Sequence, residues 1–151
     1  MIDGFPDVFE AVDLTHTVSP GMPCYPGTEP PVFLTSCTLS GEGFEEKTIT
    51  LYSHTGTHMD APAHILEGRR TLDGFDAGAF VGTGIVLDLA EPPRRVIDRE
   101  QLEPWRAEIE GRDFVLLHTG ASRDWGNPSY YENFRVLSEE AARWLAGFRP
   151  K

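Results

Sequence analysis

TGIVLDLA at residues 83–90 and DFVLLHTG at residues 113–120 are two near-continuous apolar runs of β-strand length. Apolar runs without alternation are typical of strands buried on both faces, so we expect both to be central and buried. Between them, DREQLEPWRAEIEG at 98–111 begins with Asp98, a favourable helix N-cap, and we expect Pro104 to interrupt or restart the helix. The order strand, helix, strand predicts an α/β fold.

The other predicted elements lie on either side of this unit. AVDLTHTV at 11–18 alternates and is rich in branched residues, so it predicts a strand. VFLTSCTL at 32–39 and KTITLYS at 47–53 predict an antiparallel hairpin with a glycine-containing loop. GNPSYYENF at 126–134 is rich in turn and aromatic residues and is either a surface excursion or the wall of a pocket. SEEAARWLAGF at 138–148 predicts a helix capped by its first serine, and its core candidates are Ala141, Trp144 and Leu145.

The composition restricts the class of protein and of partner. The chain has 151 residues, 40% hydrophobic and 25% charged, which is typical of one soluble globular domain over residues 1–151. Its formal net charge is -11, from 24 acidic and 13 basic side chains, and the arginines are scattered or paired, as at Arg69-Arg70 and Arg94-Arg95. Because neutralising phosphates requires clustered Lys and Arg, we expect no nucleic-acid partner and no anionic membrane surface.

Neither export nor a disulfide is indicated by the sequence. The start, MIDGFPDVFE, has no basic region followed by an apolar one, and no run approaches the roughly 18 apolar residues of a spanning helix. We therefore expect a cytoplasmic protein in which Cys24 and Cys37 remain reduced.

SHTGTHMDAPAH at 53–64 brings three of the five histidines and an aspartate into one short stretch. A helix is disfavoured here because Gly56 and Pro62 are poor residues for a helix interior. An extended chain would place four polar side chains on one face: His54, His58, Asp60 and His64. However, His54 and His58 would then stand about 13 Å apart at their backbones, so the chain must bend between them. We expect Gly56 to take the required backbone angles and Pro62 to fix the exit from the loop.

The residue types of this stretch indicate a metal site. Neutral imidazole with carboxylate is the ligand set expected for zinc, manganese or iron. Three protein ligands leave positions open for water, as in catalytic zinc sites, where the pKa of bound water falls toward about 7. His64 would then be left over as an acid or base, since imidazole exchanges protons near neutral pH. The alternative is that these histidines are ordinary loop or core residues whose ring nitrogens find backbone partners.

HTGTHMDAPAH at 54–64 resembles the H-x-G-T-H-x-D-x-P-x-H signature of the bacterial kynurenine formamidase and cyclase family of metal-dependent hydrolases, which includes isatin hydrolase. It matches that signature at every fixed position. DLTHTVSPGMPCYPG at 13–27, GIVLDL at 84–89 and FVLLHTGAS at 114–122 resemble flanking strands and turns of the family. The resemblance implies a swivelling β/β/α fold with a central mixed, barrel-like β-sheet and peripheral helices.

The resemblance also implies a function and a set of roles. Family members hydrolyse amide bonds of small aromatic compounds, formylkynurenine or isatin, and assemble as homo-oligomers, here expected to be a dimer or tetramer. It implies that His54, His58 and Asp60 bind zinc or manganese and that His64 acts in proton transfer. Tyr25 corresponds to an aromatic position near the substrate, and the alternative for this residue is simple loop packing.

The chain departs from the family at its end. Members usually run further, and their C-terminal part supplies a His and a Glu that help to hold a second metal. This chain ends at WLAGFRPK, so we expect either a C-terminally truncated form or a protein that works with one metal, as some members do with manganese. Inside the chain, we expect Glu67 and Asp73 to lie in solvated loops, and His16 and His118 to make structural hydrogen bonds.

Three functions follow from these patterns. The first is an amide hydrolase, the second a non-catalytic metal-binding or regulatory relative, and the third an acidic interaction module with incidental histidines. Metal content and the effect of a chelator on stability separate the third from the other two, and an activity screen separates the first from the second.

Overall fold

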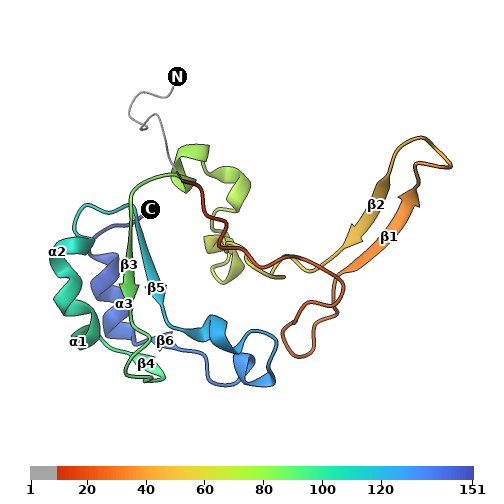
Figure 1. Ribbon diagram of the computed structural model, residues 1–151. Coiled ribbons are helices and arrows are strands. Elements are labelled where there is room, and N and C mark those ends of the chain that lie inside the picture. Colours follow the sequence, from red (N-terminus) through yellow and green to blue (C-terminus); the bar gives the residue numbers. More distant parts are fainter. Residues whose placement is uncertain (1–9) are drawn as a thin grey trace. The chain divides into compact units, whose positions relative to one another are not determined.

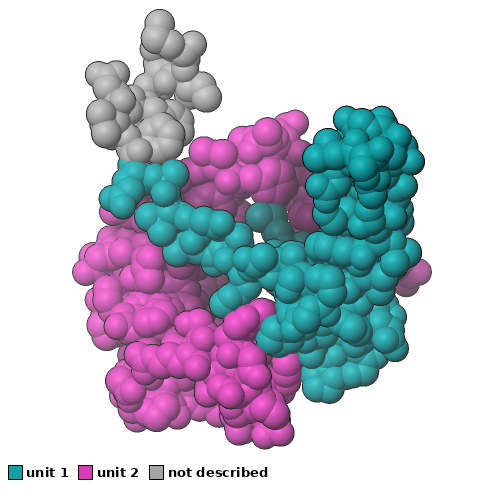
Figure 2. All heavy atoms as spheres, turned by 45° about the vertical axis from the view of Figure 1, so that its right-hand side comes forward, with its two compact units in different colours: residues 1–59 teal, residues 60–151 magenta. Residues whose placement is uncertain are grey.

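The computed structural model describes residues 10–151, so the segment at 1–9, where we expect no signal peptide, lies outside the described residues. Contacts divide the chain into two compact units, Met1–Met59 and Asp60–Lys151, which are coloured separately in Figure 2. Within the described residues, no helix is long and apolar enough to cross a membrane. The expectation of one domain over residues 1–151 stays a prediction.

The first unit contains an antiparallel hairpin (Figure 1). Its strands are β1 (Val32–Cys37) and β2 (Glu46–Thr50), which pair with Thr35 opposite Lys47. Both strands predicted for this region are therefore confirmed, each somewhat shorter than the apolar pattern indicates. All five residues of β2 are exposed, so within this unit the hairpin is held by its backbone ladder and not by a buried face.

The predicted strand at 11–18 is wrong, because this segment is irregular in the structure. The Asp13 carboxylate accepts hydrogen bonds from the backbone N–H and the hydroxyl of Thr15, at 2.9 and 2.7 Å. Such local bonds offer the backbone an alternative to a strand ladder. The backbone N–H of His16 donates to Oγ1 of Thr57 at 3.1 Å instead of to a neighbouring strand.

The second unit contains the two apolar runs as a parallel pair. β3 (Gly84–Asp88) and β5 (Phe114–His118) pair in register along their full lengths. Both strands are confirmed, but the expectation that they are central and buried is wrong in part. Leu87 is fully buried, whereas Val86 and Leu116 are 57% and 41% exposed. Val86 and Leu116 lie opposite each other in the register, so the pair is buried on the face of Leu87 and exposed on the other.

The connection between these strands is helical and interrupted where the sequence predicts. It consists of three short segments, α1 (Arg99–Leu102), the 3₁₀ turn η4 (Glu103–Trp105) and α2 (Arg106–Ile109). The backbone N–H of Asp98 donates to Oε1 of Gln101 at 3.3 Å, which ties the helix start. Pro104 lies in the 3₁₀ turn, because it cannot supply the N–H that a continuous α-helix needs.

The late helix follows a second, shorter parallel pair. β4 (Val96–Ile97) pairs with β6 (Val136–Leu137), and the chain then enters α3 (Glu139–Ala146). The side chain of Ser138 accepts a hydrogen bond from the N–H of Ala141 at 3.2 Å, so the predicted N-cap is confirmed. Five further 3₁₀ turns are η1 (Pro62–His64), η2 (Leu72–Gly74), η3 (Ala77–Phe80), η5 (Ala121–Asp124) and η6 (Pro128–Tyr131).

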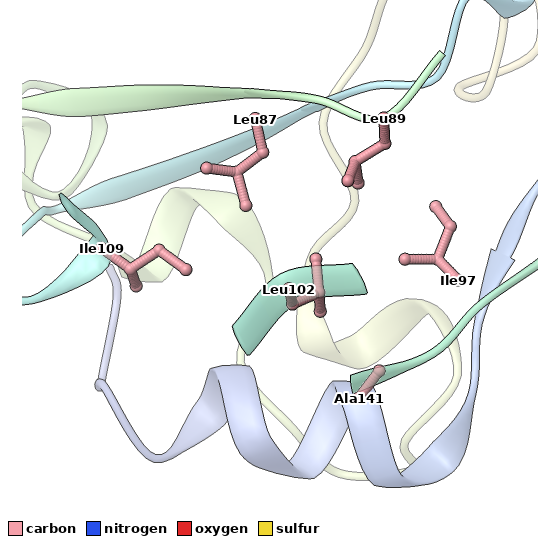
Figure 3. Close-up of a cluster of buried hydrophobic side chains, with 6 residues drawn as sticks. All are labelled: Leu87, Leu89, Ile97, Leu102, Ile109 and Ala141. Atoms are coloured by element: carbon pink, nitrogen blue, oxygen red, sulfur yellow. The ribbon is translucent and has the colours of Figure 1, made fainter. Parts of the chain in front are cut away.

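The core of the second unit lies between the parallel pair and the helices (Figure 3). Its buried cluster consists of Leu87, Leu89, Ile97, Leu102, Ile109 and Ala141. Of the core candidates in the late helix, Ala141 is fully buried, and Trp144 and Leu145 pack against the cluster. The three predicted core positions are therefore confirmed.

The α/β class holds, with one antiparallel and two parallel strand pairs and few helices among the described residues, but the barrel-like sheet is not found. Each of the three sheets has two strands: β1 with β2, β3 with β5, and β4 with β6. A barrel needs a closed ring of hydrogen-bonded strands. Two-stranded sheets cannot form such a ring, so no closed barrel is present among residues 10–151.

Candidate metal centre

The chain bends between His54 and His58 as the sequence predicts. Gly56 has φ of +67°, which lies in the left-handed region that only glycine enters at little cost. A side chain at this position would also be crowded, because a Cβ would stand 3.1 Å from Cε of Met22 and 3.5 Å from Cγ2 of Val18. The glycine therefore serves both the turn and the packing of the loop within the first unit.

The bend gathers the three expected ligands. His54, His58 and Asp60 each offer one ligand atom, and these atoms lie within 4.8 Å of one another. All three side chains are exposed, so solvent and small molecules have access to the centre of the group. Within the described part of the chain, this is the one group of three or more His, Cys, Asp or Glu side chains that could hold a metal ion.

The ring nitrogens are oriented by a backbone group. Nδ1 of His58 lies 2.9 Å from the carbonyl oxygen of Gly56. Because a carbonyl only accepts hydrogen bonds, Nδ1 carries the proton and Nε2 of the neutral ring carries the lone pair. A hydrogen bond of this kind to the outer nitrogen is the usual support of a metal-ligating histidine.

The spacing of the two imidazoles fits a divalent metal. Nδ1 of His54 lies 3.2 Å from Nε2 of His58. Two nitrogens bound at about 2.0–2.1 Å to a tetrahedral zinc would stand roughly 3.3–3.4 Å apart. The donor atoms are therefore already at the separation of two ligands of one ion, and the carboxylate of Asp60 completes a set suited to zinc or manganese.

His64 is held apart from this group by the turn that follows. Pro62 begins the 3₁₀ turn η1, where its missing N–H costs nothing, and this confirms its expected place at the exit of the loop. The N–H of Ala63 donates to the carbonyl of Arg70 at 3.2 Å, which closes the loop behind the turn. His64 is the last residue of η1, is exposed and is not one of the three grouped ligands, so its role in proton transfer stays a prediction.

Tyr25 lies in an exposed turn of the first unit. Its side chain is 61% exposed, and its carbonyl accepts hydrogen bonds from the N–H and the hydroxyl of Thr28 at 3.0 and 2.7 Å. The ring is accessible to a small molecule, and its expected contact with substrate stays a prediction.

The other acidic and histidine candidates have structural or solvated positions. Glu67 and Asp73 are exposed as expected, although Asp73 lies in the 3₁₀ turn η2 and not in a loop. Nδ1 of His118 lies 3.0 Å from Oδ1 of Asp88 on the neighbouring strand, which confirms structural hydrogen bonding for this histidine. The N–H of Ala90, together with His118, holds the pKa of the Asp88 carboxyl below its ordinary value of 3.8.

Sequence reasoning does not single out Thr57, although the structure gives it a clear part. Its hydroxyl oxygen accepts the backbone N–H of His16 at 3.1 Å. This bond ties the loop that carries the ligands to a segment 41 residues earlier in the chain. Thr57 is a fixed position of the histidine motif, but a threonine hydroxyl is not a usual ligand of zinc or manganese. This combination is the feature of the sequence that could have predicted a structural hydrogen bond at Thr57.

Comparison with known families and proteins places this geometry in context. Residues 12–151 match the model of a protein family described as "Putative cyclase". The chain is similar to the kynurenine formamidase of Geobacillus thermodenitrificans (strain NG80-2), with 31% identity over 118 residues, which is 77% of this chain and 53% of the relative. The kynurenine formamidase of Erythrobacter litoralis (strain HTCC2594) is 28% identical over 138 residues, 89% of this chain and 59% of the relative. The chain spans about half the length of the curated relatives it matches.

Two solved structures resemble the fold over most of the chain. Isatin hydrolase A from Labrenzia aggregata has a TM-score of 0.73 and 29% identity, and the match covers 89% of this chain and 62% of that one. A predicted metal-dependent hydrolase from Bacillus stearothermophilus has a TM-score of 0.72 and 29% identity, and the match covers 93% and 65%. These likenesses agree with mixed sheets and few helices.

Proposed function

The chain belongs to the cyclase family, and from this membership we propose that it is a metal-dependent hydrolase that cleaves the amide bond of a small aromatic or cyclic amide. The observation that carries the proposal is the convergence of His54, His58 and Asp60, whose ligand atoms lie within 4.8 Å of one another in an exposed loop. The names of the similar proteins, kynurenine formamidase and isatin hydrolase, support amides of the formylkynurenine or isatin kind as substrates.

In this proposal the three grouped side chains hold one zinc or manganese ion. When bound, a divalent metal polarises a carbonyl group and lowers the pKa of a water molecule, so that attack on the carbonyl carbon becomes possible near neutral pH. Nδ1 of His54 and Nε2 of His58 contribute the nitrogen lone pairs. The carbonyl of Gly56 keeps the proton of His58 on Nδ1 and so keeps Nε2 available.

The remaining roles belong to two exposed residues outside the group of three ligands. We propose that His64 moves a proton to the leaving nitrogen, since an imidazole can both accept and donate one near neutral pH. We propose that Tyr25 contacts the small-molecule substrate, in keeping with its 61% exposed ring. A swivelling β/β/α arrangement, assembly as a homo-oligomeric dimer or tetramer and a cytoplasmic location are further parts of this proposal.

Hydrolysis of formylkynurenine, isatin and formanilide by the purified chain, with zinc or manganese added, tests the assignment. We expect turnover of at least one of these compounds and its loss after chelation. Replacing His64 by alanine should lower kcat by about 10²-fold or more, the usual worth of a general acid or base, with metal content unchanged. His118→Ala is the matched control, because that histidine bonds to Asp88 outside the metal group.

Two results would count against the proposal. Folded, metal-loaded protein that hydrolyses none of these amides would support the second candidate, a non-catalytic metal-binding relative. Loss of metal from His64→Ala equal to that from His58→Ala would make His64 a ligand and remove its proposed role in proton transfer.

A further inference from the structure

A pocket of about 560 Å³ lies in the second unit, where the parallel strands β3 and β5 end. Its walls come from the loops that follow the two strands, at 90–95 and 119–124, and from the segment 129–135. Because the strands are parallel, both loops leave the same end of the pair (Figure 1). The carboxyl ends of parallel strands are where open α/β sheets bind their ligands.

The lining of this pocket is basic in an acidic protein. Four arginines line it, Arg94, Arg95, Arg123 and Arg135, against two carboxylates, Glu91 and Asp124. The whole chain carries a formal net charge of -11 and has 13 basic side chains in total. Arginines that are scattered in the sequence are therefore concentrated in space. The sequence has no basic stripe and so gives no sign of this cluster.

One of the four arginines has a structural function. The guanidinium group of Arg135 donates to the backbone carbonyls of Leu89, Ala90 and Pro92, the last two at 3.0 and 2.7 Å. These bonds pin the loop after β3 and fix one wall of the pocket. Arg135 thus shapes the site, and three of its five N–H donors are already engaged.

The other three arginines have their donors available. Among residues 10–151, the side chains of Arg94, Arg95 and Arg123 form no ion pair or hydrogen bond with another protein group. Three other exposed arginines of the same unit do have carboxylate partners: Arg99 and Arg106 pair with Glu103, and Arg143 pairs with Glu139. The lining still has more guanidinium groups than carboxylates, although Arg123 also lies within electrostatic reach of Asp88, and this excess of positive charge favours an anionic ligand.

The backbone at the edge of the pocket leaves room for such a ligand. Gly120 has φ of +76° and lines the pocket without a side chain. A Cβ at this position would stand 3.4 Å from Cβ of Ala90 and 3.9 Å from Cζ of Arg123. The guanidinium of Arg123 therefore lies close to bare backbone, and a larger residue here would occupy the space beside it.

The rest of the lining defines the chemistry of the ligand. Guanidinium groups bind carboxylate and phosphate in a bidentate manner, and Tyr130 and Phe134 add aromatic surface, with Phe134 48% exposed. We propose that this pocket binds a small organic anion, with a carboxylate or phosphate head against Arg94, Arg95 and Arg123 and an aromatic body against Tyr130 and Phe134. The pocket is lined by residues of the second unit alone, and His54, His58 and Asp60 are not among them.

Calorimetric titration of the full chain with phenyl phosphate, benzoate and benzylamine tests this proposal. The two anions should bind, and benzylamine, which has the same ring and the opposite charge, should not. Arg123→Gln and Arg94→Gln should each weaken anion binding about tenfold, as expected for loss of a charge-assisted hydrogen bond. Arg143→Gln removes the same charge from an exposed position on α3 and should leave the affinity unchanged.

The relative affinities of the two anions identify the head group that the site prefers. Binding should persist in His58→Ala and in protein freed of metal by chelator and dialysis, which separates this site from the metal centre. Equal affinity of the arginine variants and wild type would overturn the proposal, as would binding that disappears with the metal or binding of benzylamine as tight as that of benzoate.

Discussion

Nδ1 of His54 and Nε2 of His58 lie 3.2 Å apart, although the two residues are separated by a loop and not by a helical turn. An extended chain would hold their backbones about 13 Å apart. The difference is made by the left-handed turn at Gly56, whose carbonyl also orients His58. One residue therefore sets both the approach of the two rings and the tautomer of one of them, and several expected outcomes follow from that arrangement.

Replacing His58 by alanine should abolish binding of zinc or manganese. The variant loses Nε2, which lies 3.2 Å from Nδ1 of His54, and leaves two ligands that cannot hold the ion alone. Elemental analysis after gel filtration should find about one metal per chain in the wild type and less than about one tenth of that in the variant. His118→Ala, which removes an imidazole outside the group, should keep its metal. Full metal content in His58→Ala would contradict the assignment of this ligand.

Replacing Gly56 by alanine should weaken metal binding and destabilise the fold. A left-handed φ costs a residue with a side chain about 1–2 kcal/mol, and the added Cβ would meet Cε of Met22 at 3.1 Å. Urea unfolding should show a loss of at least that size, with a weaker response to added metal. Gly78→Ala is a suitable control, because a Cβ at that position meets nothing within 4 Å and φ is not in the left-handed region. Equal stability of Gly56→Ala and wild type would show that the loop can reach its shape by another route.

Replacing Leu102 by alanine should destabilise the second unit by about 2–5 kcal/mol, the range for a leucine truncated in a packed core. Leu102 is fully buried and lies in the cluster between the strand pair and α3. Leu39→Ala removes the same atoms from a side chain that is 71% exposed and should change stability by less than about 0.5 kcal/mol. Chemical unfolding of the three proteins measures both values, and similar losses in the two variants would contradict the assigned core.

The elements that the sequence predicts correctly depend on local patterns. The interrupted helix around Pro104 and the cap at Ser138 follow from residues within one or two turns of each other. The metal centre is predictable for the same reason, since its ligands lie within seven consecutive residues and the bend needs one glycine. Features made by residues close together in the chain can therefore be predicted from a single sequence.

The features that the sequence does not predict depend on distant partners. The segment at 11–18 has the alternation of a strand, but a strand also needs a neighbour, and none pairs with it here. The exposure of Val86 depends on what packs against its face of the strand pair, which its own apolar run does not specify. The arginine pocket escapes prediction because Arg94 and Arg123 come together only when β3 and β5 pair.

Replacing Asp113 by asparagine should lower stability at neutral pH and have less effect in acid. The carboxylate accepts the backbone N–H of Thr83 at 2.8 Å and pairs with Nζ of Lys151 at 3.1 Å, and these contacts hold the pKa of Asp113 below its ordinary value of 3.8. Because the folded state favours the ionised form, the contribution of the Asp113 carboxylate to stability is complete above the pKa of the unfolded state. This contribution is lost as the pH falls through the lower pKa of the folded state. The stability difference between variant and wild type should therefore be largest at pH 7 and shrink progressively below about pH 4. Urea titrations at several pH values measure it, with Asp73→Asn as a control that removes one charge from the exposed 3₁₀ turn η2. A difference that stays constant from neutral to acid pH would show that the cost of the substitution is steric and that the bonds to Thr83 and Lys151 do not stabilise the ionised form.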